Sequence, residues 1–134
     1  EAKALGIAEM VLFCGNVNRP EDYLQAMDVF VMTSLFEGLP IVGVEAQASG
    51  LPCIFADTIT QEVKILPQTQ FLALTQPDEA WAERIVQTKP MERSRAGHCV
   101  ESAGFAEENL DRQVCALYGM EEHHFANISG RDHL

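Results

Sequence analysis

The sequence has little positive charge. Only 9 Lys and Arg residues stand against 20 Asp and Glu residues, so the net charge is −11 at pH 7. A protein that binds a nucleic-acid backbone needs clustered Lys and Arg to neutralise phosphates, so this composition argues against nucleic acid as a partner. The mean electrostatic field also repels a free anionic nucleotide, so a nucleotide site must supply its own local hydrogen-bond donors.

Long apolar runs and closely paired cysteines are absent as well. No run approaches the ~18 residues that a membrane span needs, and the first eight residues have the pattern of a helix end rather than of a signal peptide. The chain has no initiator Met, so we expect it to belong to something longer. We expect reduced thiols, two of them in core strands, because the spacing of the cysteines matches no metal motif. They are Cys14, Cys53, Cys99 and Cys115.

Apolar runs alternate with helical patterns over residues 1–120, and this alternation indicates the fold class. Runs that are apolar on both faces and linked by helices predict an α/β fold: a partial doubly wound, Rossmann-like parallel sheet of about four strands with helices on both sides. The polar residues 121–134 predict a flexible tail. The expected strands are Met10–Cys14, Asp28–Ser34, Cys53–Ala56 and Gln70–Leu74. The expected helices are 1–8, 19–27, 40–49, 78–89, 91–103 and 106–120, with a loop and a short helix over 57–65.

The junction between Ser34 and Gly50 is the most informative segment. A strand ends at Ser34, a turn containing Gly38 follows, and a helix begins near Pro40. In a parallel sheet this junction lies at the carboxyl ends of the strands, where ligands of such folds bind. The free N–H groups and the positive dipole end of a helix start form a cradle for an anion, and a glycine lets the backbone approach a phosphate closely.

Two glutamates make this segment more specific. Glu37 lies in the turn, and Glu45 lies eight positions later in a helix that is otherwise almost wholly apolar, on the side of Ile41 and Ala48. A carboxylate buried there without partners would be costly, so we expect Glu45 to face a polar cleft. It stands roughly 7 Å along the axis from the helix start, which would let one acid reach a sugar and the other a ribose. The spacing alone leaves the alternative open that Glu45 is a solvated helix acid and Glu37 a local cap.

The stretch Asp28–Pro40, followed by Glu45, resembles the family-four retaining glycosyltransferases of the GT-B fold. Their hallmark is a pair of glutamates with seven residues between them, here Glu37 and Glu45. The longer run Gly43–Ile54 looks most similar to bacterial capsular and exopolysaccharide enzymes. The resemblance covers about residues 5–118 and is specific in its middle.

This resemblance implies that residues 1–120 are part of the domain that binds a nucleotide-diphosphate sugar, with no metal or other cofactor. Glu37 would be the catalytic residue that contacts the hydroxyls of the donor sugar, and Glu45 would bind the ribose hydroxyls. The loop that contains Gly15 and Val17 would lie beside the nucleobase. Backbone N–H groups would bind the diphosphate, and they belong to Gly38, Leu39, Ile41 and Val42.

The resemblance also implies missing parts. The family's second domain begins with two further strand–helix units, whose loop carries an Arg and a Lys that neutralise the leaving diphosphate, and an acceptor-binding amino-terminal domain precedes it. We find no counterpart, so we expect no transfer by this chain alone. The absent strands would leave open sheet edges, which favour a homodimer. A cytoplasmic location is implied, and association of the parent enzyme with the inner membrane face is compatible with it.

Two other functions stay open from the residues. The first is a non-catalytic nucleotide-binding or interaction module that keeps the pocket without the chemistry. The second is a flavodoxin-like receiver, which would need a cluster of acids after its first strand, and Val11–Gly15 offers none. His123, His124 and His133 lie in the polar tail, and we do not expect them to bind a metal.

Overall fold

A computed structural model describes residues 1–89 and 92–105 of the chain. These residues form a three-stranded sheet in the order β1-β2-β3, and both strand pairs are parallel. The strands are β1 (Phe30–Met32), β2 (Cys53–Ala56) and β3 (Gln70–Leu72). The predicted α/β class with a parallel sheet is therefore confirmed, with three strands in the described residues instead of about four.

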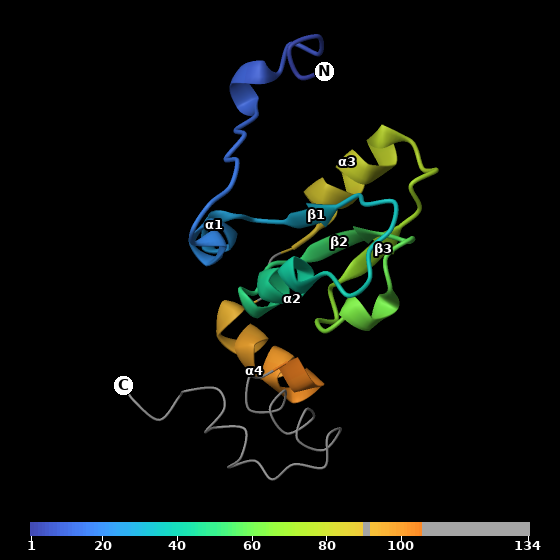
Figure 1. The fold of residues 1–134 in the computed structure, drawn as a ribbon. Helices are drawn as coiled ribbons and strands as arrows, with labels where there is room; N and C mark the ends of the chain where they lie inside the picture. Colours follow the sequence, from blue (N-terminus) through green and yellow to red (C-terminus); the bar gives the residue numbers. More distant parts are fainter. Residues whose placement is uncertain (90–91, 106–134) are drawn as a thin grey trace.

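Helices cover both faces of this sheet. Figure 1 shows α2 and α3 on opposite sides of the strands, with α4 beyond α2. Local sequence explains where two of the helices begin: α1 has Pro in its first turn, and α3 has two acids in its first turn and Arg84 in its last, which suits the helix dipole. The α-helices are α1 (Pro20–Ala26), α2 (Ile41–Ala48), α3 (Asp78–Gln87) and α4 (Ala96–Val100). Single tighter or wider turns occupy Ala8–Met10, Gln61–Val63, Arg93–Arg95 and Glu101–Phe105.

The face of the sheet toward α2 is aromatic and closely packed. The Phe55 ring lies between Phe30 and Phe71, with ring centroids 6.1 and 5.8 Å apart. A Cβ on Gly43 of α2 would stand 2.8 Å from Cζ of Phe55 and 3.1 Å from Cγ2 of Val63. Only a residue without a side chain lets α2 approach the sheet this closely.

The opposite face packs against α3. Trp81 is buried, and Ile85 packs beside it against the same core, as their helical spacing predicts. The guanidinium of Arg84 donates a hydrogen bond of 2.9 Å to Oε1 of Gln70 in β3. These contacts fix α3 over the face that carries alternate residues of each strand.

The carboxyl end of α2 is closed by a Schellman motif. Gly50 has φ +76° and donates to the Gln47 carbonyl at 2.9 Å, while Leu51 donates to the Ala46 carbonyl at 3.0 Å. The left-handed conformation suits glycine. The helix expected over 40–49 therefore ends where the sequence predicts.

The predicted strand Met10–Cys14 is wrong. Its residues form no strand, and the side chains of Met10, Leu12 and Phe13 are 86, 83 and 84% exposed. Figure 1 shows this amino-terminal segment leading away from the sheet. A strand needs a neighbouring strand for its backbone groups, and no described strand lies beside this one. Cys14 is consequently exposed, contrary to its predicted place in the core, whereas Cys53 is fully buried as predicted.

Other element boundaries also differ from the sequence predictions. The expected helix at 1–8 is a series of turns in which Gly6 has φ +70°. The short helix expected within the loop 57–65 is the single 3₁₀ turn Gln61–Val63. The strands expected at 28–34 and 70–74 are shorter. No helix of the described part is long and apolar enough to cross a membrane. The expected helix at 106–120, the tail at 121–134, Cys115 and the tail histidines all lie outside the described residues.

Candidate functional site

Two turns meet at the carboxyl end of the sheet. The turn after β1 leads into α2, and the turn after β2 lies beside it. The Thr58 hydroxyl donates a hydrogen bond of 2.8 Å to the Ser34 carbonyl, and Glu37 forms a parallel bridge with Ile59. The long-range pairing holds the loop that carries Glu37 against the neighbouring loop.

The amino-terminal turn of α2 offers unpaired donors. The carbonyl of Pro40 accepts from the N–H groups of Gly43 and Val44, at 2.9 and 3.4 Å. The N–H groups of Leu39, Ile41 and Val42 find no acceptor within the described residues, as the first turn of a helix leads one to expect. Because these donors sit at the positive end of the helix dipole, they can bind an anion.

The backbone beside these donors, at Gly38, has open space next to it. A Cβ placed on Gly38 would meet nothing within 4 Å. Pro40 has no N–H to offer, so it interrupts the row of donors.

A pocket of about 600 Å³ lies between α2 and the segment around α4. Glu45 projects into it from the exposed side of α2, with Ile41 and Ala48 of the same helix beside it. Among the described lining residues Glu45 is the one ionisable group, so the pocket is more apolar than the polar cleft expected from the sequence. Its wall consists of Leu39, Ile41, Val44, Glu45, Ala48, Val100, Ala103, Gly104 and Phe105.

The pocket brings together three of the eight predicted site residues: Leu39, Ile41 and Glu45. The other five do not line it within the described part of the chain. Gly15 is exposed with φ +63°, and Val17 is half-buried in the same loop. The roles assigned to all eight stay predictions. The five outside the wall are Gly15, Val17, Glu37, Gly38 and Val42.

Residues 1–88 match the family described as Glycosyl transferases group 1. The chain belongs to this family. It is 45% identical over 118 residues to the putative glycosyltransferase EpsF of Bacillus subtilis (strain 168), a match that covers 87% of this chain and 31% of EpsF. It is 36% identical over 117 residues to the Vi polysaccharide biosynthesis protein VipC/TviE of Salmonella typhi, covering 81% of this chain and 20% of that protein.

These matches confirm the family resemblance drawn from the sequence. The chain spans less than a third of the length of both relatives, 31% and 20%. No solved structure gives a significant match.

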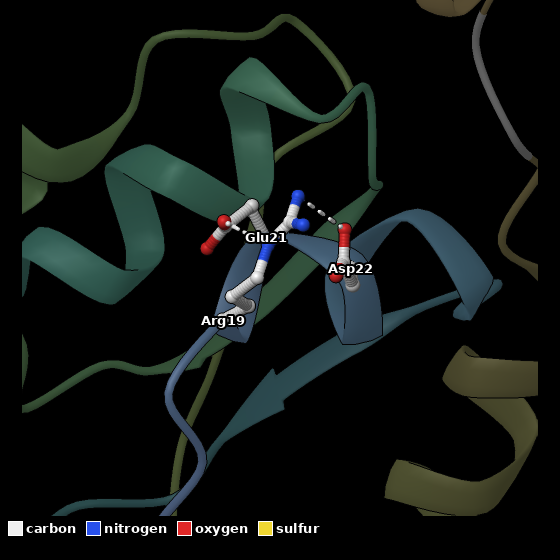
Figure 2. Close-up of polar contacts among 3 residues, drawn as sticks. All are labelled: Arg19, Glu21 and Asp22. Carbon is white, nitrogen blue, oxygen red and sulfur yellow. Dashed lines mark hydrogen bonds and ion pairs between the residues drawn. The ribbon is translucent and has the colours of Figure 1, made fainter.

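Two arginines of this group 1 glycosyltransferase chain, Arg19 and Arg93, form their polar contacts away from the pocket. Arg19 forms ion pairs of 3.1 Å with both Glu21 and Asp22 at the start of α1, and Figure 2 shows its guanidinium between the two carboxylates. A hydrogen bond from its own backbone N–H, and then one from Arg19, lowers the pKa of Glu21 below its ordinary value. The pair is solvent-exposed, so it contributes little to stability.

Arg93 instead caps the carboxyl end of a helix. Its guanidinium donates to the carbonyls of Gln25 and Met27, at 2.6 and 2.8 Å, and so satisfies the carboxyl end of α1. No Lys or Arg of residues 1–89 and 92–105 lines the pocket. Over the same residues, no group of three or more His, Cys, Asp and Glu side chains is placed to hold a metal.

Sequence reasoning missed two features of the site. The first is the wall formed by Val100, Gly104 and Phe105, which are more than 50 positions from Glu45 and carry no motif. The second is Gln47, which is fully buried and makes five hydrogen bonds. A lone Gln on the core side of an apolar helix is an available signal, since such an amide must find partners.

Proposed function

We propose that this chain is the donor-binding portion of a retaining glycosyltransferase that acts in bacterial surface polysaccharide synthesis, with a nucleotide-diphosphate sugar as its donor and no metal or other cofactor. Family membership and the relatives named for glycosyl transfer and polysaccharide biosynthesis support this. A further relative, 42% identical over 53 residues, is an Escherichia coli enzyme named for transfer from UDP-Gal; the match covers 40% of this chain and 14% of that enzyme.

One observation carries the proposal: Glu45 shares its pocket with Leu39 and Ile41 at the start of α2. In this assignment, the carboxylate of Glu45 accepts hydrogen bonds from the ribose hydroxyls. The neighbouring N–H groups bind the diphosphate, because an anion is stabilised by first-turn donors and by the helix dipole. A nucleoside diphosphate carries its ribose hydroxyls close to its phosphates. This spacing matches the Glu45 carboxylate and the N–H groups at the start of α2.

Glu37 and the Gly15–Val17 loop complete the assignment. Glu37 contacts the hydroxyls of the donor sugar and is the catalytic residue, while the loop lies beside the nucleobase. The bridge from Glu37 to Ile59 supports this role, because a catalytic group on a loop must be held in position by neighbouring structure.

We expect the chain alone to bind but not to transfer. Negative charge develops on the leaving diphosphate, and fixed cations are usually the largest source of its stabilisation. The described pocket wall contains no Lys or Arg. A radiolabelled sugar-transfer assay on the isolated chain should therefore show no turnover, and measurable turnover would refute this part of the proposal.

Isothermal titration calorimetry with UDP and GDP tests the binding role. We expect one of the two to bind, and Glu45→Gln to weaken it by about 10- to 100-fold, since hydrogen bonds to a charged group contribute about 1.5–3 kcal/mol. Glu83→Gln on α3 is the matched control, because Glu83 is an exposed helix acid away from the pocket. Absence of binding by the unaltered chain, or equal effects of the two substitutions, would contradict the assignment.

A chimera separates a transferase portion from a non-catalytic module. This chain would replace the matching region of EpsF, and sugar transfer by the chimera would be measured with and without Glu37→Gln. Transfer that is lost with Glu37→Gln supports a catalytic role. A chimera that binds nucleotide without transferring sugar favours the non-catalytic module.

A further inference from the structure

The stretch that leads from β1 to Glu37 contains one residue more than the neighbouring chain. In the sheet, Met32 of β1 lies opposite Phe55 of β2. Continued in the same register, the pairing would bring Phe36 opposite Ile59. Glu37 lies there instead, so an extra residue has been accommodated between the sheet and this bridge. An extra residue in one strand bends the chain and re-aims the side chains that follow, and such bulges are frequent next to active sites.

The hydrogen-bond pattern of the β1–β2 pair predicts a donor for the carbonyl of Ser34. Phe30 donates its N–H to the carbonyl of Pro52, the residue before its partner in β2. In a parallel pair these bonds are evenly spaced, and a residue that donates in this way accepts from the residue after its partner. Repeated at every second residue, the pattern would let the Ser34 carbonyl accept from the backbone N–H of Thr58.

The chain after β2 turns away from this pattern, and the side chain of Thr58 replaces the backbone donor. The N–H of Ile59 donates back to the carbonyl of Ala56 at 3.1 Å, which closes a turn. The hydroxyl of Thr58 donates to the Ser34 carbonyl at 2.8 Å. A hydroxyl rotates to suit its acceptor, whereas a backbone N–H is fixed by the turn. Ser34 therefore stays attached to the loop after β2 beyond the end of the regular ladder.

The contact between Thr58 and Ser34 lies between the end of the sheet and the bridge of Glu37. At the far side of that bridge, Ile59 is 2% exposed and belongs to the hydrophobic core. Glu37 is half-buried beside it. The bulge is thus attached at two points, the Ser34 carbonyl and the bridge itself. Without the hydroxyl of Thr58, one of these two attachments is lost.

We propose that Thr58 is a positioning residue for sugar transfer and that it acts through Glu37. Its hydroxyl holds the bulge that brings Glu37, rather than Phe36, to the buried Ile59. This role rests on the proposed function, in which Glu37 contacts the donor sugar and is the catalytic residue. A misplacement of about 1 Å can lower a rate by about 100-fold, so loss of this hydrogen bond should slow transfer. Nucleotide binding should change little, because Glu45 lies on α2 rather than on the bulge.

Hydrogen exchange read by mass spectrometry tests the attachment on the chain alone, without any substrate. Thr58→Val removes the hydroxyl and keeps the shape of the side chain, so the amides of residues 35–38 should exchange faster. Thr58→Ser keeps the hydroxyl and should leave their exchange unchanged. Thr88→Val is the matched control, because the Thr88 hydroxyl donates to the Arg84 carbonyl at 2.7 Å at the end of α3. Exchange at residues 35–38 that does not respond to Thr58→Val would overturn the proposal.

Sugar transfer by the EpsF chimera tests the role in catalysis. At saturating donor, Thr58→Val should lower kcat by about 10- to 100-fold. Thr58→Ser should keep most of the rate, and Thr88→Val should leave it unchanged. The dissociation constant for UDP or GDP, whichever binds the unaltered chain, should stay close to its original value in every variant. Far-UV circular dichroism must show that the variants fold, and Thr58→Ala replaces Thr58→Val if the latter does not.

The outcomes separate a failure of the positioning role from a failure of the proposed function. If the unaltered chimera transfers no sugar, the proposed function fails, and the role of Thr58 fails with it. If the chimera transfers sugar and Thr58→Val is as fast as Thr88→Val, the positioning role alone is refuted. It is also refuted if Thr58→Val weakens nucleotide binding as strongly as it slows transfer, because the hydroxyl would then support the whole site rather than Glu37.

Discussion

The buried amide of Gln47 holds the loop after α2 and β2 in place. Its Nε2 donates to the carbonyls of Gly43 and Val63, at 2.9 and 2.7 Å. Its Oε1 accepts from the N–H groups of Ile65 and Leu66, both at 2.9 Å, and from the Thr69 hydroxyl at 2.7 Å. One side chain therefore provides hydrogen-bond partners to four groups within residues 63–69, the segment that leads into β3.

Replacing Gln47 by Leu keeps the approximate volume and removes every one of these bonds. Four groups outside α2 then lose their partner, and each buried unsatisfied group costs about 1–3 kcal/mol. Part of the loop can turn its groups toward water, so the full sum is not reached. We expect a loss of about 4 kcal/mol, at the upper end of single-residue effects and a large share of the ~5–15 kcal/mol that stabilises a typical domain.

Urea unfolding followed by circular dichroism measures this loss. With a slope of about 1–3 kcal/mol per molar urea, the midpoint should fall by about 1.3–4 M, or the variant should be unfolded without urea. Gln61→Leu is the control, because Gln61 is exposed nearby and should change stability by no more than about 0.5 kcal/mol. A loss below about 1 kcal/mol for Gln47→Leu would refute the reasoning.

Three further outcomes follow from the packing. Gly43→Ala should destabilise the chain by about 1–3 kcal/mol, because the added Cβ would clash with Phe55. Gly97→Ala in α4, where a Cβ would meet nothing within 4 Å, should be neutral or stabilise by up to about 1 kcal/mol. Equal unfolding midpoints of the two variants would contradict this. In iodoacetamide labelling read by mass spectrometry at pH 8, exposed Cys14 should react at once and Cys53 only after unfolding, because burial raises the Cys53 pKa to about 12. Stability should also fall as the pH rises from about 9 toward 12, because an unfolded-chain thiol ionises there and the folded one does not; a flat urea midpoint over that range would contradict it.

Hydrophobic periodicity, together with proline at helix starts and glycine at helix ends, was sufficient to locate most of the helices and strands. Sequence runs that are apolar on both faces located β1, β2 and β3, and Gly50 marked the end of α2. These signals are local: an apolar run, a proline at a helix start and a glycine with positive φ act on neighbouring residues. The pair Glu37 and Glu45 was likewise visible as a spacing, and it led to the family that the comparison with known proteins then confirmed.

Long-range pairing decided the rest. Met10–Cys14 has the composition of a buried strand, yet it stays exposed because a strand exists only beside another strand, and composition does not say whether one is there. Likewise, only the tertiary structure places Phe105 opposite Glu45 and gives Gln47 its partners. The sequence alone determined the local elements and the family, because those depend on nearby residues and spacing. The pocket wall arose from contacts between distant segments, so only the folded chain determined it.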